Sequence, residues 1–515
     1  MPDPIKILEV SGDDWMKGLS IHPYIGSGGL FKRATNFDPF RKIGIYTPSQ
    51  GQSRIGAGVV TIEARWIVPF SSSSLVAGVT YFYAFGSSTL YLGRTTQGAL
   101  PGGGNGFIED QSSRLSSPWF GEKGAIKFKD KIVYISTTGI AAGTIPLPAT
   151  PSVTKLLGNL TNTYSHFPHI GPDRNLYVTN GKSIAKITNV TGTSDNEAEY
   201  LTFENDVVTR GITNDGQHLI ITGDGQGDIE PNVGTAAGRY RCFVAFWNMK
   251  GKDLTRIWEF EDNHVSGATA IEDEIIVFGS QTVYKCNVNS RPLPLLPKGG
   301  NSRIQISSPE PGSINKVSDS IVLWSGEGYA EDNNDKKTIF GYGRLHPSLP
   351  KSLFTVHTIT GSPGGTATIF SLFSDSGNTG NIIASYGNSM YIFTGTNNTS
   401  TIVLAGIDFK QPYEFSFAKV VLNNKLDTGQ SVDIEIISDD IPVVRNTQGT
   451  SNSFNQSNFS GKKSHIFYPY PGATASESSA LFENLTDIKI TNVGADVKRF
   501  EIWAEPVAPD QDIYK

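Results

Sequence analysis

Short apolar runs, broken by turns of Gly, Ser, Asn or Asp, recur along most of the chain. Residues 271–286, IEDEIIVFGSQTVYKC, show the unit: a polar turn, the run EIIVF, the turn GSQ and a second run, TVYKC. β-branched and aromatic residues fill the runs and turn-forming residues interrupt them, which is typical of a strand, a tight turn and a second strand. The segment is predicted to form a β-hairpin.

The same pattern returns around Tyr83, Val133, Tyr177, Ile220, Val322 and Tyr391. Most neighbouring copies are about 40 to 55 residues apart, and a repeat of this period built from short strands is typical of β-propeller blades. A blade cannot bury both of its faces alone, so blades stack in a ring. The pattern predicts an irregular β-propeller over residues 54–405, with six to eight blades.

The pattern changes after residue 405. Val432, Ile434 and Ile436 alternate strictly with Asp433 and Glu435, as in a strand with one buried and one solvated face. The stretches KSHIFYPYPG, LTDIKITNVG and KRFEIWAEPV add at least three more strands. Residues 406–515 are therefore predicted to form a C-terminal β-sandwich.

Residues 1–53 look different from both regions, because isolated aromatic residues lie there among Gly and Pro. The segment is predicted to be an extended N-terminal arm. One interpretation is that it closes the propeller by giving a strand to the last blade; the other is that it reaches a neighbouring subunit. Exposed rings forfeit about 1.5 to 3 kcal/mol each, so something must cover them. The candidate interface residues are Phe31, Phe37, Phe40 and Tyr46.

Composition agrees with an all-β fold. The chain has 515 residues, of which 55 are Gly and only 18% are charged, and no window sustains a helical apolar period. The net charge is −6 and basic residues are spread thinly, so specific nucleic-acid binding is not expected. No apolar run reaches the length of a membrane span and no signal peptide is evident, which predicts a soluble protein made in a cytoplasm, with no membrane partner.

Candidate chemistry is sparse. Cys242 and Cys286 lie on predicted strands and are expected to be buried and reduced. His166 and His169, with Asp173 nearby, are better explained as structural residues than as metal ligands.

Two acidic loops, one with Asp224, Asp228 and Glu230 and one with Glu331, Asp332 and Asp335, lack a full calcium-binding pattern. No nucleophile elbow, phosphate loop or sialidase box is present. The sequence therefore predicts no enzyme activity, no catalytic residue, no cofactor and no metal.

The leader GGLFKRATNFDPFRKIGIYTPSQG, the irregular blades and the closing stretches AKVVLNNKLDTGQSVDIEI and KRFEIWAEPV resemble, in this order, the propeller-bearing structural proteins of tailed bacteriophages. The resemblance implies a virion protein of the tail or head–tail junction, assembled in the host cytoplasm. It also implies a homo-oligomeric ring around the particle axis and contacts with other tail or connector proteins.

Two other functions stay open at this point. A carbohydrate- or receptor-binding propeller would use exposed aromatic residues, for which Trp247, Trp258 and Trp324 are the candidates. A propeller glycoside hydrolase would need two facing carboxylates, and the sequence singles out no such pair.

Overall fold

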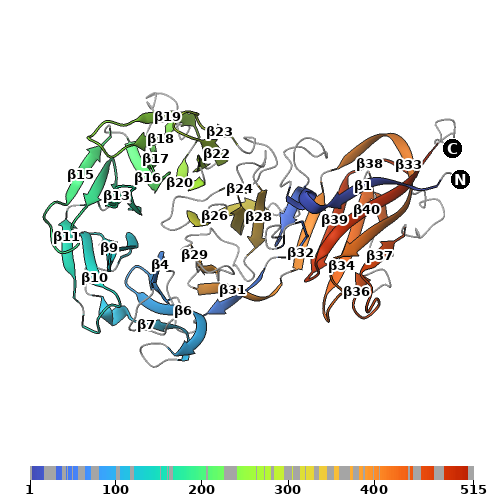
Figure 1. Cartoon of the computed structure of the whole chain (residues 1–515), viewed down its shortest axis with the longest axis horizontal. Coiled ribbons are helices and arrows are strands. Elements are labelled where there is room, and N and C mark those ends of the chain that lie inside the picture. The colour runs from blue at the N-terminus through green and yellow to red at the C-terminus, as the bar shows by residue number, and fades with distance from the viewer. Residues whose placement is uncertain are drawn as a thin grey trace. The chain divides into compact units, whose positions relative to one another are not determined.

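The computed structural model shows a chain of β-strands joined by loops (Figure 1). It describes residues 3–16, 31–37, 42, 44–48, 50–55, 64–70, 81–99, 105–115, 121–150, 152–158, 160–161, 166–203, 207–225, 241–262, 264–271, 273–279, 283–294, 304–305, 314–318, 321–329, 336–344, 353–358, 372–374, 382–386, 389–397, 399–404, 406–438, 441–444, 454–468 and 481–507. Helical structure in these ranges is limited to two 3-10 turns, η1 (Gly12–Met16) and η2 (Ser112–Arg114). No helix among them is long and apolar enough to span a membrane. The all-β prediction is confirmed.

The chain forms two compact units. The propeller unit comprises Gln52–Gly341 and Ile359–Thr394. The two-sheet unit comprises Met1–Gly51, Tyr342–Thr358 and Gly395–Lys515. The sequence pattern placed the limits at 54–405 and 406–515, whereas the observed two-sheet unit also takes in the N-terminal residues and a short central segment.

The propeller unit contains six four-stranded sheets. The first three are β4 (Trp66–Phe70), β5 (Tyr81–Phe85), β6 (Leu90–Ala99) and β7 (Asn105–Asp110); β8 (Gly124–Phe128), β9 (Lys131–Ser136), β10 (Gly139–Thr144) and β11 (Thr154–Gly158); and β12 (Pro168–Ile170), β13 (Leu176–Asn180), β14 (Ser183–Ile187) and β15 (Glu197–Thr202). The next two are β16 (Val207–Asn214), β17 (Leu219–Gly225), β18 (Arg241–Trp247) and β19 (Arg256–Glu261); and β20 (Val265–Ile271), β21 (Glu274–Gly279), β22 (Val283–Cys286) and β23 (Leu293–Pro294).

The remaining sheets complete the ring. β25 (Ile314–Ser318) and β24 (Ile304–Gln305) both pair with β26 (Ile321–Tyr329), and β27 (Lys336–Arg344) follows β26 across the limit of the unit. The last sheet has the order β29 (Leu372–Ser374), β30 (Ile382–Tyr386), β31 (Ser389–Asn397) and β3 (Gln50–Ile55). The strand β3 comes from the N-terminal segment, so that segment closes the last blade, as one of the two interpretations predicted.

The innermost strands of successive sheets pack against one another in the order β4, β8, β12, β16, β20, β25 and β29, and β29 packs against β4. Figure 1 shows the sheets arranged around a common centre. The described residues thus form a closed propeller of seven blades, which confirms the predicted β-propeller and lies within the predicted range of six to eight.

The blades are apolar on both faces because each lies between two others. On β17, Leu219 and Ile221 pack in a cluster with Tyr177 of the preceding blade, while Ile220 packs in a cluster with Val277 of the following blade. Successive residues of a strand point to opposite faces, so a strand buried on both sides needs an unbroken apolar run. This requirement explains why the repeated pattern in the sequence is a run rather than an alternation.

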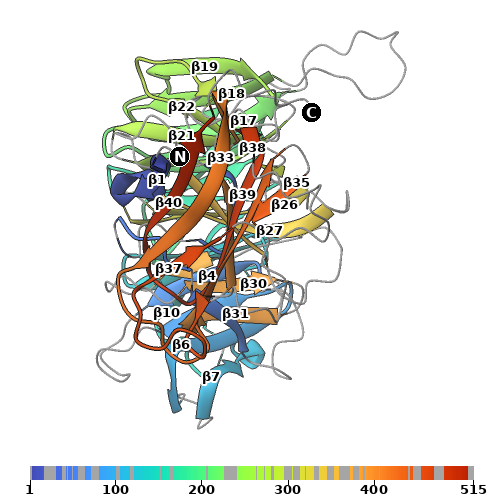
Figure 2. The same ribbon diagram turned by 90° about the vertical axis from the view of Figure 1, so that its right-hand side faces the viewer.

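The two-sheet unit is built differently. One sheet has the order β1 (Ile5–Ser11), β40 (Val497–Pro506), β33 (Ile407–Leu422) and β37 (Ser464–Phe467), with β38 (Leu481–Leu485) also paired to β33. The other has, within this unit, β28 (Leu353–Thr358), β2 (Phe31–Thr35), β32 (Thr399–Leu404), β39 (Asp487–Val493), β34 (Ser431–Ser438) and β35 (Ile441–Val444), with β36 (Phe454–Asn455) paired to β34. Figure 2 shows β1, β40 and β33 side by side.

Both sheets contribute to one hydrophobic core. Phe500 and Ile502 of β40 pack in the same cluster as Ile434 of β34 and Ile490 of β39. The strand β34 alternates buried and half-buried residues from Ser431 to Ser438, as its sequence predicted. The strand β34 thus buries one face, in contrast to β17 in the blades.

The N-terminal segment is not a separate arm in the described structure. Its strand β1 pairs along β40, and β2 pairs with β32, where Phe31 lies opposite Leu404. Isolated bridges join Phe37 to Pro48 and Tyr46 to Val497. The segment therefore completes both sheets of the unit that the C-terminal residues form.

Candidate functional site

The candidate interface residues lie in the interior of their own chain. Phe31, Phe37 and Tyr46 are all 0% exposed and belong to the core of the two-sheet unit. The Phe31 and Phe37 rings are 5.5 Å apart edge to face, and the Phe37 and Tyr46 rings are 4.9 Å apart. Phe40 lies outside the described residues. These three rings were expected at a subunit contact, and this expectation is corrected: strands more than 350 positions away in sequence cover them, so no second subunit is needed to bury them.

A polar cluster around the buried Asp224 links the fourth and fifth blades. Asp224, at the end of β17, is 6% exposed. Its Oδ1 lies 3.2 Å from Nε of Arg210 on β16, and its Oδ2 lies 2.7 Å from Nδ1 of His264, just before β20. Arg210 and Asp224 meet because the β16–β17 hairpin pairs Val208 with Asp224. The carboxylate therefore holds a cation from its own blade and an imidazole from the next.

The electrostatics of this cluster favour a charged carboxylate. Burial alone would raise the pKa of Asp224, but the hydrogen bond with His264 and the charge of Arg210 outweigh that effect and hold the pKa below its usual value. Nδ1 of His264 faces this carboxylate and is placed to donate to it.

Three polar atoms from the segments that carry β17 and β20 are buried and make no hydrogen bond: Nε2 of His264, Oγ1 of Thr222 and Oγ of Ser266. Thr222 is two residues before Asp224 on β17, so both side chains point to the same face of the strand. Because Nε2 is buried, it has no route to a substrate in this conformation. The cluster is best explained as a polar link between blades.

The acidic loop that contains Asp224 does not gather calcium ligands among the described residues. The carboxylate of Asp224 is already paired within the chain, while Asp228, Glu230, Glu331, Asp332 and Asp335 lie outside the described residues. In the part of the chain that the structure describes, no group of three or more His, Cys, Asp or Glu residues could hold a metal ion.

The paired histidines are structural. His166 is 1% exposed, with Nδ1 2.6 Å from the carbonyl of Thr179 and Nε2 3.0 Å from the carbonyl of Thr161. His169 lies on β12, with Nε2 2.8 Å from the side-chain nitrogen Nδ2 of Asn214. Burial lowers the pKa of His169 to about 4, so it is neutral near pH 7.

Two of the tryptophans considered for carbohydrate binding are committed to packing. Trp247 is 0% exposed, packs edge to face on Tyr177 and donates from Nε1 to the carbonyl of Gly251. Trp258 donates to the carbonyl of Asn287 and lies 5.0 Å from the guanidinium of Arg256. Trp324 lies on β26.

The two cysteines, Cys242 and Cys286, are buried and free, as predicted.

Only part of this cluster could be found from the sequence. Asp224 was singled out by its glycine-rich turn, and Arg210 lies on the paired strand two residues after Val208, the register partner of Asp224, so strand pairing would have brought the two close. His264 comes from the following blade, and no local pattern connects it to Asp224.

No family model matches the chain, and a search of curated proteins finds no match. Among solved structures, the WD40 propeller domain of Doa1 aligns with a TM-score of 0.41 and 10% identity, over 68% of this chain and 97% of that one. BamB from Moraxella catarrhalis aligns with a TM-score of 0.38 and 10% identity, over 67% and 97%. The designed protein Ika8 aligns with a TM-score of 0.38 and 8% identity, over 67% and 100%. With TM-scores below 0.5, these likenesses support no inference about function.

Proposed function

We propose that the chain is a structural virion protein of a tailed bacteriophage, located in the tail or head–tail junction, and that it works by protein–protein contacts. The architecture supports the proposal through one observation. The propeller is inserted between segments of a unit whose N-terminal and C-terminal strands, β1 and β40, pair with each other. The chain therefore passes repeatedly between two β units, and each unit offers a surface for protein–protein contacts.

The resemblance of the leader, the blades and the closing strands to phage structural proteins supplies the biological setting. In this role the protein is a homo-oligomer with tail or connector partners and needs no cofactor. The contacts of the buried Asp224 suit this role, because they join neighbouring blades.

Two of the three tryptophans that suggested carbohydrate binding are used in packing. Trp247 is buried, and the indole nitrogen of Trp258 donates a hydrogen bond to the carbonyl of Asn287.

Mass spectrometry of purified particles of the phage that encodes the chain tests the proposal. The expected result is a fixed copy number, well below that of the major capsid protein, that persists through density-gradient purification. Absence of the chain from particles, with the protein free in the lysate, would overturn it.

A further inference from the structure

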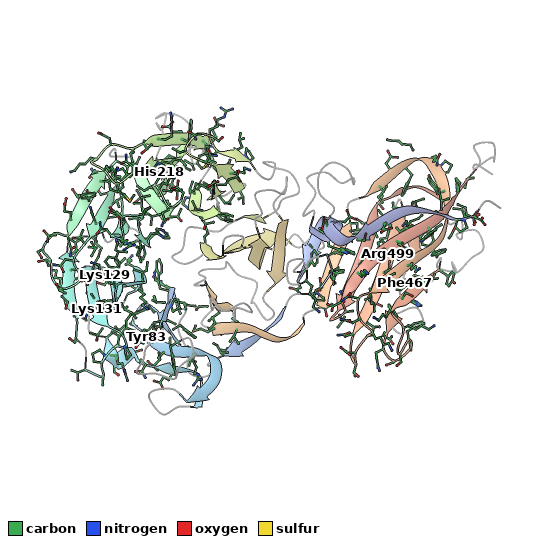
Figure 3. All side chains as sticks on the ribbon, in the orientation of Figure 1. Tyr83, Lys129, Lys131, His218, Phe467 and Arg499 are labelled. Carbon is green, nitrogen blue, oxygen red and sulfur yellow. The ribbon has the colours of Figure 1, made fainter. Side chains whose placement is uncertain are left out.

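The outward face of the β1–β40–β33–β37 sheet carries aromatic and charged residues, unlike the inward face. On β40, Phe500, Ile502 and Ala504 lie in the core, so Arg499, Glu501, Trp503 and Glu505 project from the opposite face. On β33, the residues paired with them are Val421, Lys419, Phe417 and Glu414. We call these eight residues the outer face; Figure 3 labels Arg499 on it.

An aromatic pair occupies the middle of the outer face. Phe417 and Trp503 lie opposite each other, with ring centroids 5.6 Å apart and planes inclined by 20°. Trp503 donates from Nε1 to Oε2 of Glu501 at 3.0 Å. Oε1 of Glu501 lies 2.8 Å from Nε of Arg499, and Glu501 is only 3% exposed. A buried carboxylate, paired with the more exposed Arg499, thus fixes the orientation of the half-buried Trp503.

The charges are separated along the strands. Glu414 and Glu505 lie directly opposite each other at one end, and like charges in this position repel. Lys419 and Arg499 lie toward the other end, past the aromatic pair. Among the described residues, no ion pair is formed by Glu414, Glu505 or Lys419. On the same side of the sheet, Lys6 and Glu9 of β1 lie opposite Trp503 and Glu501 and form an ion pair, and Arg499 is paired with Glu501. The unpaired charges of the outer face are therefore acidic at one end, through Glu414 and Glu505, and basic at the other, through Lys419, with the aromatic pair between them.

We infer that the outer face binds the same face of a second copy of this chain. A twofold axis that runs across the strands at the Phe417–Trp503 pair reverses the strand direction of the second copy. It places Glu414 and Glu505 of each copy over Lys419 of the other, and the aromatic pairs over each other. A partner of a single charge sign would repel one end, whereas a second copy is complementary at both.

The composition of the face agrees with this role. Trp and Arg, together with Tyr, are the residues most enriched at binding hot spots. Tyr468, which directly follows β37, is 66% exposed and extends the aromatic surface beyond the outer face. The inference supplies a contact for the oligomer in the proposed function and rests on that function only for its biological setting.

Charge exchange tests the inference in the full-length chain. Sedimentation equilibrium is expected to show that the wild-type chain forms a dimer. Either E414K/E505K or K419E alone should weaken the dimer at least tenfold, because each places like charges together. An equimolar mixture of the two variants should recover the dimer, since both contacts regain opposite charges.

The matched control is E435K, which changes an exposed charge on the other sheet and should leave the dimer intact. A second variant, W503A, should abolish dimerisation in protein whose circular dichroism is unchanged. Two results would overturn the inference. One is a wild-type chain that stays monomeric when its concentration in the sedimentation experiment is raised 100-fold. The other is an equimolar mixture of the two charge variants that stays monomeric. Neither result depends on whether the chain is found in particles, so failure of this contact and failure of the virion role are distinguishable.

Discussion

The blades and the two-sheet unit bury the apolar faces of their strands in different ways. In the propeller unit a strand such as β17 is buried on both faces, because each blade packs between two neighbours and the ring closes through β3. In the two-sheet unit a strand such as β40 buries one face and leaves Trp503 and Glu505 on the other. The comparison teaches that the closed ring buries the apolar faces of its blades against one another. The two-sheet unit retains a face whose residues Glu414, Glu505 and Lys419 form no ion pair among the described residues.

The largest expected effect comes from removing an aromatic side chain that the N-terminal segment contributes to the core of the two-sheet unit. The variant F37A should destabilise the two-sheet unit by about 3 to 5 kcal/mol, because a fully buried phenylalanine is lost and a cavity remains. Denaturant unfolding followed by circular dichroism measures the change. If Phe37 served only a subunit contact, dilute monomer would unfold as the wild type does.

A matched exposed residue provides the control. Ile257, on the outermost strand of the fourth blade, is 45% exposed, so I257A should change stability by less than about 0.5 kcal/mol.

The polar link between blades gives the next largest effect. D224N should cost about 3 kcal/mol, because Asp224 is buried and its carboxylate loses the charge that binds Arg210 and His264. E435Q breaks the exposed pair with Lys489 and should cost less than about 1 kcal/mol. Equal effects of both substitutions on the midpoint of chemical denaturation would show that the Asp224 cluster is not a link between blades.

A smaller effect should appear on acidification. Burial, reinforced by the charge of Lys462, lowers the pKa of His465 to about 4; its ring lies against Phe454, Phe459 and Phe467. The ordinary pKa is 6.5. The unfolded chain therefore binds the proton first, and the contribution of neutral His465 to stability is full above about pH 6.5 and is lost as the pH falls toward 4.

Melting temperatures between pH 7.5 and 4.5 measure this loss. H465Q should flatten the part of the profile that belongs to the two-sheet unit, and H169Q should flatten the corresponding part for the propeller, where His169 also has a pKa of about 4. Unchanged slopes in both variants would show that neither histidine is kept neutral by the fold.

The sequence predicted the parts of the fold that depend on local pattern. The apolar runs identified the blades, and the alternation of Val432, Ile434 and Ile436 identified a strand with one buried face. It did not predict that β1 pairs with β40, because nothing near residue 5 indicates a partner at residue 504. The rings of Phe31 and Phe37 were recognised as needing cover, but their cover comes from β32 and β39, which only the tertiary structure brings there.

The outer face was missed for a similar reason. Trp503 and Phe417 are far apart in sequence, and only the register between β33 and β40 makes them neighbours. Glu414 and Glu505 each look like ordinary surface charges in the sequence, and their repulsion becomes visible only when they lie opposite each other.

Hydroxyl-radical footprinting of the wild-type chain at low and high protein concentration tests most directly whether the open face of the two-sheet unit is the self-associating surface. Oxidation of Trp503, Phe417 and Tyr468 is expected to fall as the concentration rises, while oxidation of half-buried Trp258, on the outermost strand of a blade, stays constant. Constant oxidation of the first three residues, or protection confined to blade residues such as Trp258, would contradict the account.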